Sequence, residues 1–269
     1  RELHAAIEAN LDHPALGFLW GAAGGMLAAL FMFERTGEAR WQALFLRSVD
    51  KLWQTWRYHE PLDCYLWTQD LYGERAIRPG ALHGFAGTVS GMLRGRALLP
   101  DVRRAELPSR TKRTLTATAL RGGAHANWPW TIAAGKNASE DPLRVQHCTG
   151  APGLVNCLAA LPQDPETDAL LIAAGELTWR AGPTTKLPSL CHGAPGSGYA
   201  FLKLFARTGD ESWLLRARRF AMHAIEQGER GLREHGQRKF SLWTGDLGLA
   251  VYLWDCIRAS ERFPTLDVF

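Results

Sequence analysis

The chain lacks a long apolar run and lacks a large excess of charge of either sign. No stretch reaches the roughly 18 consecutive apolar residues of a membrane-spanning helix, so we expect no membrane span. The 31 basic and 27 acidic residues leave a formal net charge of +4. Because the arginine clusters are not interleaved with aromatic residues, we also expect no nucleic-acid partner.

Cysteine is scarce as well. The 269 residues include five cysteines, an odd number in a chain long enough to bury a core without disulfide bonds. With no secretory signal visible, this favours a reducing, cytoplasmic location. The Cys-x-x-Cys spacing of structural zinc sites is absent. An initiator methionine is missing too, so we expect the chain, which opens on Arg1, to be a processed form or part of a longer protein.

Glycine, in contrast, is abundant and regularly placed. A Gly-x-x-Gly signature recurs five times, each time before an apolar helical run, and the pairs are Gly21/Gly24, Gly84/Gly87, Gly150/Gly153, Gly193/Gly196 and Gly245/Gly248. Such glycines permit a turn with positive φ and a close approach of neighbouring helices. Amphipathic segments such as residues 39–56 and 213–227 lie between the turns.

These repeats predict a chain of antiparallel helix pairs, each with an inner glycine-led helix and a more charged outer helix. Pairs of this kind arranged in a ring form an all-α fold, an α/α toroid, with every glycine turn at the same end. We expect one such domain over residues 1–269. Two insertions, residues 60–81 and 124–145, run into glycine turns, and we expect them to lie over the mouth where the turns gather.

The residues that carry candidate chemistry directly precede glycine turns. Cys148, Cys191 and His192 are ligand types that zinc prefers, and three protein ligands leave a fourth position open for chemistry. Spacing alone leaves open that both cysteines are ordinary core residues. His83 occupies the same position, directly before the first glycine, in the second turn. There it would exchange a proton near the metal or, alternatively, cap the following helix. The other three cysteines are predicted to be structural.

Four motifs resemble the lanthionine synthetase C family, the LanC cyclases and LanC-like proteins. They are LHGFAG at 82–87, QHCTGAPG at 146–153, LCHGAPGSGYAFLKL at 190–204 and SLWTGDLGLAVYL at 241–253. The resemblance implies a toroid of seven inner and seven outer helices around a zinc ion. It further implies that Cys148, Cys191 and His192 bind the zinc and that His83 stands close to it.

The chain departs from the family pattern in three places. Its five glycine repeats resemble the third to the seventh, so we expect the first two to be lacking. Lantibiotic cyclases carry an aspartate shortly before the third repeat, where residues 17–21 here read GFLWG. His147 stands where the family usually has tryptophan before the first ligand cysteine. The motif spellings and the missing aspartate favour the LanC-like branch.

The function implied by this resemblance is zinc-dependent addition of a thiol to dehydroalanine or dehydrobutyrine, which gives a thioether. The partner would be a peptide or protein that contains dehydroamino acids, or glutathione. One alternative is a six-hairpin α/α glycosidase, for which Asp70 and Asp246 are the only plausible pair of carboxylates. Another is a non-catalytic LanC-like fragment. The sequence does not identify the residues that bind the substrate.

Overall fold

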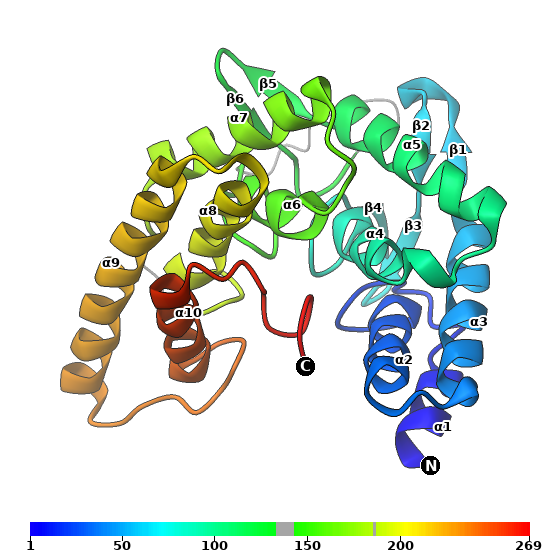
Figure 1. Cartoon of the computed structure of the whole chain (residues 1–269), viewed down its shortest axis with the longest axis horizontal. Coiled ribbons are helices and arrows are strands. Elements are labelled where there is room, and N and C mark those ends of the chain that lie inside the picture. Colours follow the sequence, from blue (N-terminus) through cyan, green and yellow to red (C-terminus); the bar gives the residue numbers. More distant parts are fainter. Residues whose placement is uncertain (133–142, 185–186) are drawn as a thin grey trace.

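The computed structural model describes residues 1–132, 143–184 and 187–269, so part of the second insertion lies outside the described residues. Helices dominate this part of the chain, and Figure 1 shows them arranged as an open arc. The helices are α1 (Glu2–Ala9), α2 (Ala22–Thr36), α3 (Ala39–Thr55), α4 (Phe85–Arg94), α5 (Asp101–Ala117), α6 (Ala151–Leu158), α7 (Pro165–Ala181), α8 (Ala194–Thr208), α9 (Glu211–His235) and α10 (Asp246–Arg258). The all-α prediction is confirmed.

The glycine turns begin the inner helices, as expected. The first glycine of each pair is the residue immediately before α2, α4, α6, α8 or α10. The helices that follow, α3, α5, α7 and α9, pack on them from outside, and this alternation is visible in Figure 1. Helix pairs led by glycine turns are therefore the repeating unit of the fold.

Each outer helix buries one apolar stripe. In α3 the buried stripe includes Trp41, Leu44, Val49 and Leu52, which recur at helical spacing. The predicted segment 39–56 ends one residue beyond the helix. These stripes join the inner helices in one extended core that runs through the whole arc. No helix among the described residues combines the length and the apolar character needed to cross a bilayer.

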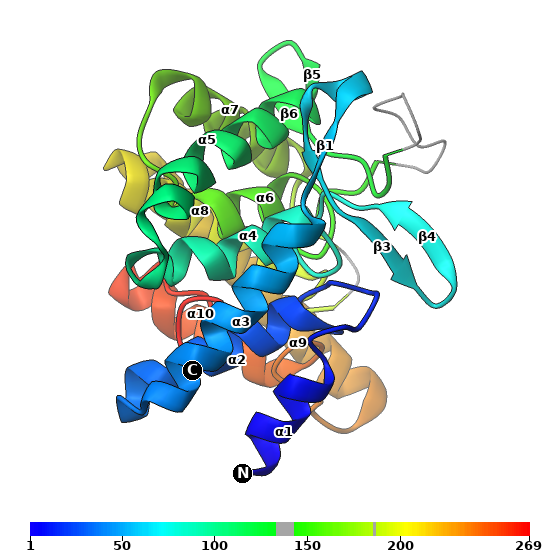
Figure 2. The same ribbon diagram turned by 90° about the vertical axis from the view of Figure 1, so that its right-hand side faces the viewer.

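Short antiparallel hairpins lie in and just before the insertions. At the first insertion, β1 (Arg57–His59), which precedes it, pairs with β2 (Cys64–Leu66), and β3 (Thr68–Leu71) pairs with β4 (Glu74–Ile77). At the second, β5 (Leu120–Gly122), which precedes it, pairs with β6 (His125–Asn127). Figure 2 shows the hairpins gathered on one side of the helices. An isolated bridge between Ile77 and Ile132 ties the two insertions together.

The glycines are required chiefly by contacts with the chain that leads into each turn. A Cβ atom on Gly87 would lie 1.8 Å from the carbonyl oxygen of Ala81, and one on Gly196 would lie 1.8 Å from that of Leu190. The expected positive φ is found at Gly21 and Gly150. At the other three first glycines φ is negative, so that part of the prediction was wrong. Lack of space for a side chain is the more general reason.

Candidate functional site

Backbone hydrogen bonds connect the first glycine turn to the second, and the third, fourth and fifth turns to one another. Phe18 N donates to Leu82 O at 3.1 Å, Cys148 N donates to Cys191 O at 3.0 Å, and Cys191 N donates to Trp243 O at 2.9 Å. The rings of Phe18 and Trp243 meet edge to face, 5.9 Å apart, so the first and last turns also touch. We call this assembly of turns the mouth.

Two of the candidate ligands lie side by side at the mouth. A hydrogen bond from the Cys191 thiol to the sulfur of Cys148 lowers the pKa of Cys148 below the ordinary value of a cysteine. Gln146 Nε2 also donates to Cys148 Sγ, at 3.0 Å. For the same reason the Cys191 thiol keeps its proton and its pKa is raised. Cys148 is therefore the more acidic thiol of the pair.

His192 follows Cys191 in the same turn and is half-buried, and its carbonyl oxygen accepts a hydrogen bond from Thr184 Oγ1 at 3.1 Å. Across residues 1–132, 143–184 and 187–269, no three His, Cys, Asp or Glu side chains form a group that could hold a metal. The thiol pair suits zinc chemically, because thiolate sulfur is a preferred zinc ligand. The structure thus brings two of the candidate ligands together, and the role of His192 stays a prediction.

His83 lies at the mouth between two tryptophans. Its ring stacks on Trp20 with centroids 5.3 Å apart, and meets the edge of Trp130 at 6.1 Å. Burial, and then the nearby charge of Arg78, lower the pKa of His83. The neutral imidazole that results is the form that can accept a proton.

Two buried asparagines that the sequence reasoning missed hold the Cys148 turn. Asn127 Oδ1 accepts from Ala151 N at 2.8 Å, at the start of α6. Asn156 Nδ2 lies 2.8 Å from Gly196 O and 3.0 Å from His147 Nδ1, and so joins the two cysteine-bearing turns. A polar residue within the apolar run of α6 was the signal that could have identified Asn156.

His147 packs next to these turns with a buried ring. Its ring is fully buried and stacks on Phe263, with centroids 4.4 Å apart, and on Trp243 at 5.7 Å. Complete burial lowers the pKa of His147 to about 3. Its ring therefore packs flat against Phe263 and Trp243, while its Nδ1 contacts Asn156.

A sequence model of the family described as "Lanthionine synthetase C-like protein" matches residues 80–268. The chain belongs to this family. The matched range contains His83, Cys148, Cys191 and His192. Over 133 residues the chain is 36% identical to the zebrafish (Danio rerio) protein named glutathione S-transferase LANCL1, an alignment that covers 47% of this chain and 32% of the relative.

A second relative is the LanC-like protein GCL1 of Arabidopsis thaliana. It is 31% identical over 133 residues, which cover 46% of this chain and 30% of the relative. The aligned part of this LanC-like chain thus spans about a third of the length of the curated relatives it matches.

Two further positions of the LanC-like chain bear on the glycosidase alternative. Asp246 Oδ2 accepts from Lys239 N at 2.7 Å, and Asp246 Oδ1 lies 3.3 Å from Arg238 Nη1. This carboxylate therefore closes the turn before α10. Asp70 lies in β3 opposite Arg75. Neither contact favours a role in sugar hydrolysis.

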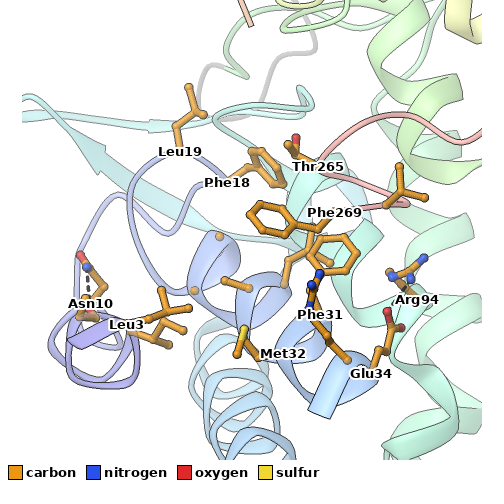
Figure 3. A pocket seen from close by; sticks show the side chains of 18 of the residues that line it. Leu3, Asn10, Phe18, Leu19, Phe31, Met32, Glu34, Arg94, Thr265 and Phe269 are labelled. Atoms are coloured by element: carbon orange, nitrogen blue, oxygen red, sulfur yellow. Dashed lines mark hydrogen bonds and ion pairs between the residues drawn. The ribbon is translucent and has the colours of Figure 1, made fainter. Parts of the chain in front are cut away.

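A large apolar groove lies at the open end of the arc. It has a volume of about 910 Å³ and is lined by α1, α2, the stretch from Phe18 to Trp20, and the C-terminal tail. Figure 3 shows Phe31 against Phe269, whose ring centroids are 5.8 Å apart, and the ion pair of Arg94 with Glu34. Cys148 and Cys191 are not among its lining residues. We call it the open-end groove.

Proposed function

We propose that this LanC-like chain adds a thiol to a dehydroamino acid residue to form a thioether. The observation that supports the proposal most directly is the hydrogen-bonded pair of thiols at the mouth, in which the pKa of Cys148 is lowered. In this proposal Cys148, Cys191 and His192 hold a zinc ion. Zinc supplies an open coordination position that lowers the pKa of a bound substrate thiol.

The protein's own residues would prepare this centre before any metal arrives. Gln146 and Cys191 donate hydrogen bonds to the sulfur of Cys148 and so hold it as an acceptor. Asn127 and Asn156 hold the surrounding backbone, because they bond to the start of α6 and to the α8 turn. A preformed donor pair reduces the reorganisation that binding requires.

His83 would carry the proton. The substrate sulfur forms a bond to the β-carbon, the carbon–carbon π bond opens, and the proton that leaves the sulfur must reach the α-carbon. A neutral His83, with a pKa lowered by burial and by Arg78, can accept that proton and deliver it to the enolate. The stacking of Trp20 on the imidazole restricts the ring to one plane.

The dehydroamino acid would belong to a peptide or protein, and the thiol would belong to the same chain or to glutathione. Glutathione is the thiol suggested by the printed name of the zebrafish relative, glutathione S-transferase LANCL1. We include a cytoplasmic location in the proposal, because a reducing compartment keeps both the ligand cysteines and the substrate thiol reduced.

Metal analysis and a mass-shift assay test this function together. The wild type should bind about one zinc per chain and should add glutathione to a dehydroalanine peptide. Cys191→Ala should lose both properties. Cys157→Ala, which changes a buried cysteine of α6 outside the pair, should keep both.

His83→Ala should retain zinc but slow the addition about 100-fold or more, which is the usual range for loss of an acid–base group. Wild-type protein that fails to bind zinc, or that binds zinc and forms no adduct, would contradict the proposal.

A further inference from the structure

An exposed tyrosine stands at the tip of the β3–β4 hairpin, in a conformation that tyrosine disfavours. Leu71 pairs with Glu74, so Tyr72 and Gly73 form the turn, and their φ values are 58° and 81°. Such turns favour asparagine, aspartate or glycine, because a bulky side chain at positive φ is strained. The Tyr72 side chain is 81% exposed, so burial in the core does not explain its presence. A strained residue of this kind points to a role in function.

The Tyr72 ring is the outer end of a row of rings that leads to His83. It meets the Trp20 ring at 68°, with centroids 5.6 Å apart, and the Trp20 ring lies nearly parallel to that of His83 at 5.3 Å. Trp20 is itself 42% exposed. We call Tyr72 and Trp20 the aromatic pair. The pair joins an open surface to the residue that the proposed function places at the reacting carbon.

The other end of the row is closed by protein. The rings of His83 and Trp130 are 6.1 Å apart, and the guanidinium carbon of Arg78 lies 5.5 Å from the ring centre of Trp130. Arg78 is only 2% exposed, so protein covers this side of His83. A peptide that approaches His83 along the row must therefore pass over the aromatic pair.

Backbone contacts hold the two segments of the aromatic pair together. Asp70 N donates to Pro14 O at 2.9 Å, which ties β3 to the segment before α2 that carries Trp20. Trp20 O accepts from Gly17 N at 2.9 Å, and a Cβ atom on Gly17 would come 3.5 Å from the Cα atom of His83. The aromatic surface is thus formed before any ligand arrives, which reduces the ordering that binding requires.

We propose that the aromatic pair binds an aromatic side chain of the peptide or protein substrate, two or three residues from its dehydroamino acid. The inference rests on the proposed thiol addition. Aromatic rings attract one another in edge-to-face and offset arrangements, and two rings at an angle present both an edge and a face to a third. An extended peptide advances roughly 3.3–3.6 Å per residue, so a side chain at this separation from a dehydroalanine at His83 would reach the pair.

Fluorescence anisotropy with labelled peptides tests the subsite apart from the reaction. In these peptides alanine replaces the dehydroalanine, so that no thioether can form. Each member of the set carries one phenylalanine, at a position from one to five residues away on either side of that alanine. Wild-type protein should bind most tightly when the phenylalanine is two or three residues away, by about tenfold over the peptides in which it is five residues away.

Three variants separate the ring from the turn. Tyr72→Asn removes the ring and supplies a residue that tolerates positive φ, so the midpoint of thermal unfolding should stay the same or rise. The preference for one phenylalanine position should fall to about twofold or less, because one ring of the pair is gone. Tyr72→Phe keeps the ring and should keep the preference. Phe269→Asn, which removes a ring that is 90% exposed at the open-end groove, should keep it as well.

Two results would overturn the proposal outright. One is wild-type protein that binds every peptide equally or binds none, and the other is an unchanged preference in folded Tyr72→Asn. If circular dichroism shows that Tyr72→Asn is unfolded, peptides with cyclohexylalanine in place of phenylalanine decide. The saturated ring is apolar but lacks the π-system, so these peptides should bind less tightly. Equal affinity would count against recognition of an aromatic ring.

The outcome separates the subsite from the proposed function. Glutathione addition is measured on the same peptides with dehydroalanine restored. If the wild type forms adducts but binds and reacts equally at every phenylalanine position, the reaction stands and the subsite falls. If the preference is found in binding and no adduct forms, the subsite stands and the proposed reaction falls. Cys191→Ala should keep the preference even where it loses zinc and adduct formation.

Discussion

The mouth and the open-end groove are built in different ways. At the mouth, backbone hydrogen bonds join the turns and glycines lie in contact with carbonyl oxygens. At the groove, side chains of α1, α2 and the tail meet loosely, and Leu3 and Phe269 remain 45% and 90% exposed. A site that must hold two sulfur atoms at a fixed separation needs backbone contacts like those at the mouth, because such contacts leave fewer alternative arrangements.

The C-terminal tail reaches both regions and offers the sharpest test of this difference. Phe263 is fully buried against His147 and Tyr199, whereas Phe269 contacts Phe31 in the groove. Phe263→Ala should lower the free energy of unfolding by about 3–5 kcal/mol, as large cavities do. Phe269→Ala should change it by less than about 0.5 kcal/mol. Urea denaturation measures both, and equal losses would break the comparison.

Glycine substitutions probe the same contrast at the level of the backbone. In Gly87→Ala the new methyl group would meet the carbonyl oxygen of Ala81, and we expect a loss of about 1–3 kcal/mol in the free energy of unfolding. In Gly25→Ala, at the groove, the nearest atom is 3.0 Å away on the side chain of Ile7, not on the backbone. The gain in helix propensity should offset that contact, so the net change should stay below about 1 kcal/mol.

Thermal and urea unfolding of the two alanine variants would decide the matter. If Gly25→Ala proves as damaging as Gly87→Ala, the groove is packed as tightly as the mouth.

The smallest effect concerns the chemistry of the thiol pair. In metal-free protein, alkylation of Cys148 by iodoacetamide should rise with pH at a lower pH than for an ordinary cysteine, because its pKa is lowered and the thiolate is present above the pKa and is lost below it. Cys191→Ala removes the hydrogen bond that lowers this pKa, so the midpoint of the pH curve should move upward. The rate at pH 6.5 should then fall, because a pKa that is higher by one leaves about a tenth of the thiolate.

Peptide mapping by mass spectrometry follows each cysteine separately. Cys64 is the internal control, because it is buried and burial raises its pKa to about 11. Alkylation of Cys148 that follows the same pH curve in the wild type and in Cys191→Ala would contradict the assigned hydrogen bond.

Local features were predictable from the sequence alone. The turns at Gly21, Gly84, Gly150, Gly193 and Gly245 each begin a helix, and the outer helices follow from their apolar periodicity. The short hairpins of the insertions were not predicted. Their strands of three or four residues carry little periodicity of their own and rely on bonds to other segments, such as that from Asp70 N to Pro14 O.

Part of the candidate site could also be predicted from the sequence. Cys148, Cys191 and His83 each lie directly before a glycine turn, and this shared position predicted that they are neighbours. Arg78 could not be found in this way, because its burial depends on Trp130, 52 positions further along the chain. In the sequence Asn156 is one polar residue in an apolar helix. Its contact with Gly196 of α8 is visible only in the tertiary structure.

The sequence by itself therefore determined the repeating helix pair and the end of each pair at which chemistry can occur, since glycine and apolar spacing act over a few residues. Only the tertiary structure decided which thiol is the more acidic, which arginine is buried, and that the first and last turns meet through Phe18 and Trp243. A pKa and a ring contact depend on distances through space between residues far apart in the chain. No local pattern encodes those distances.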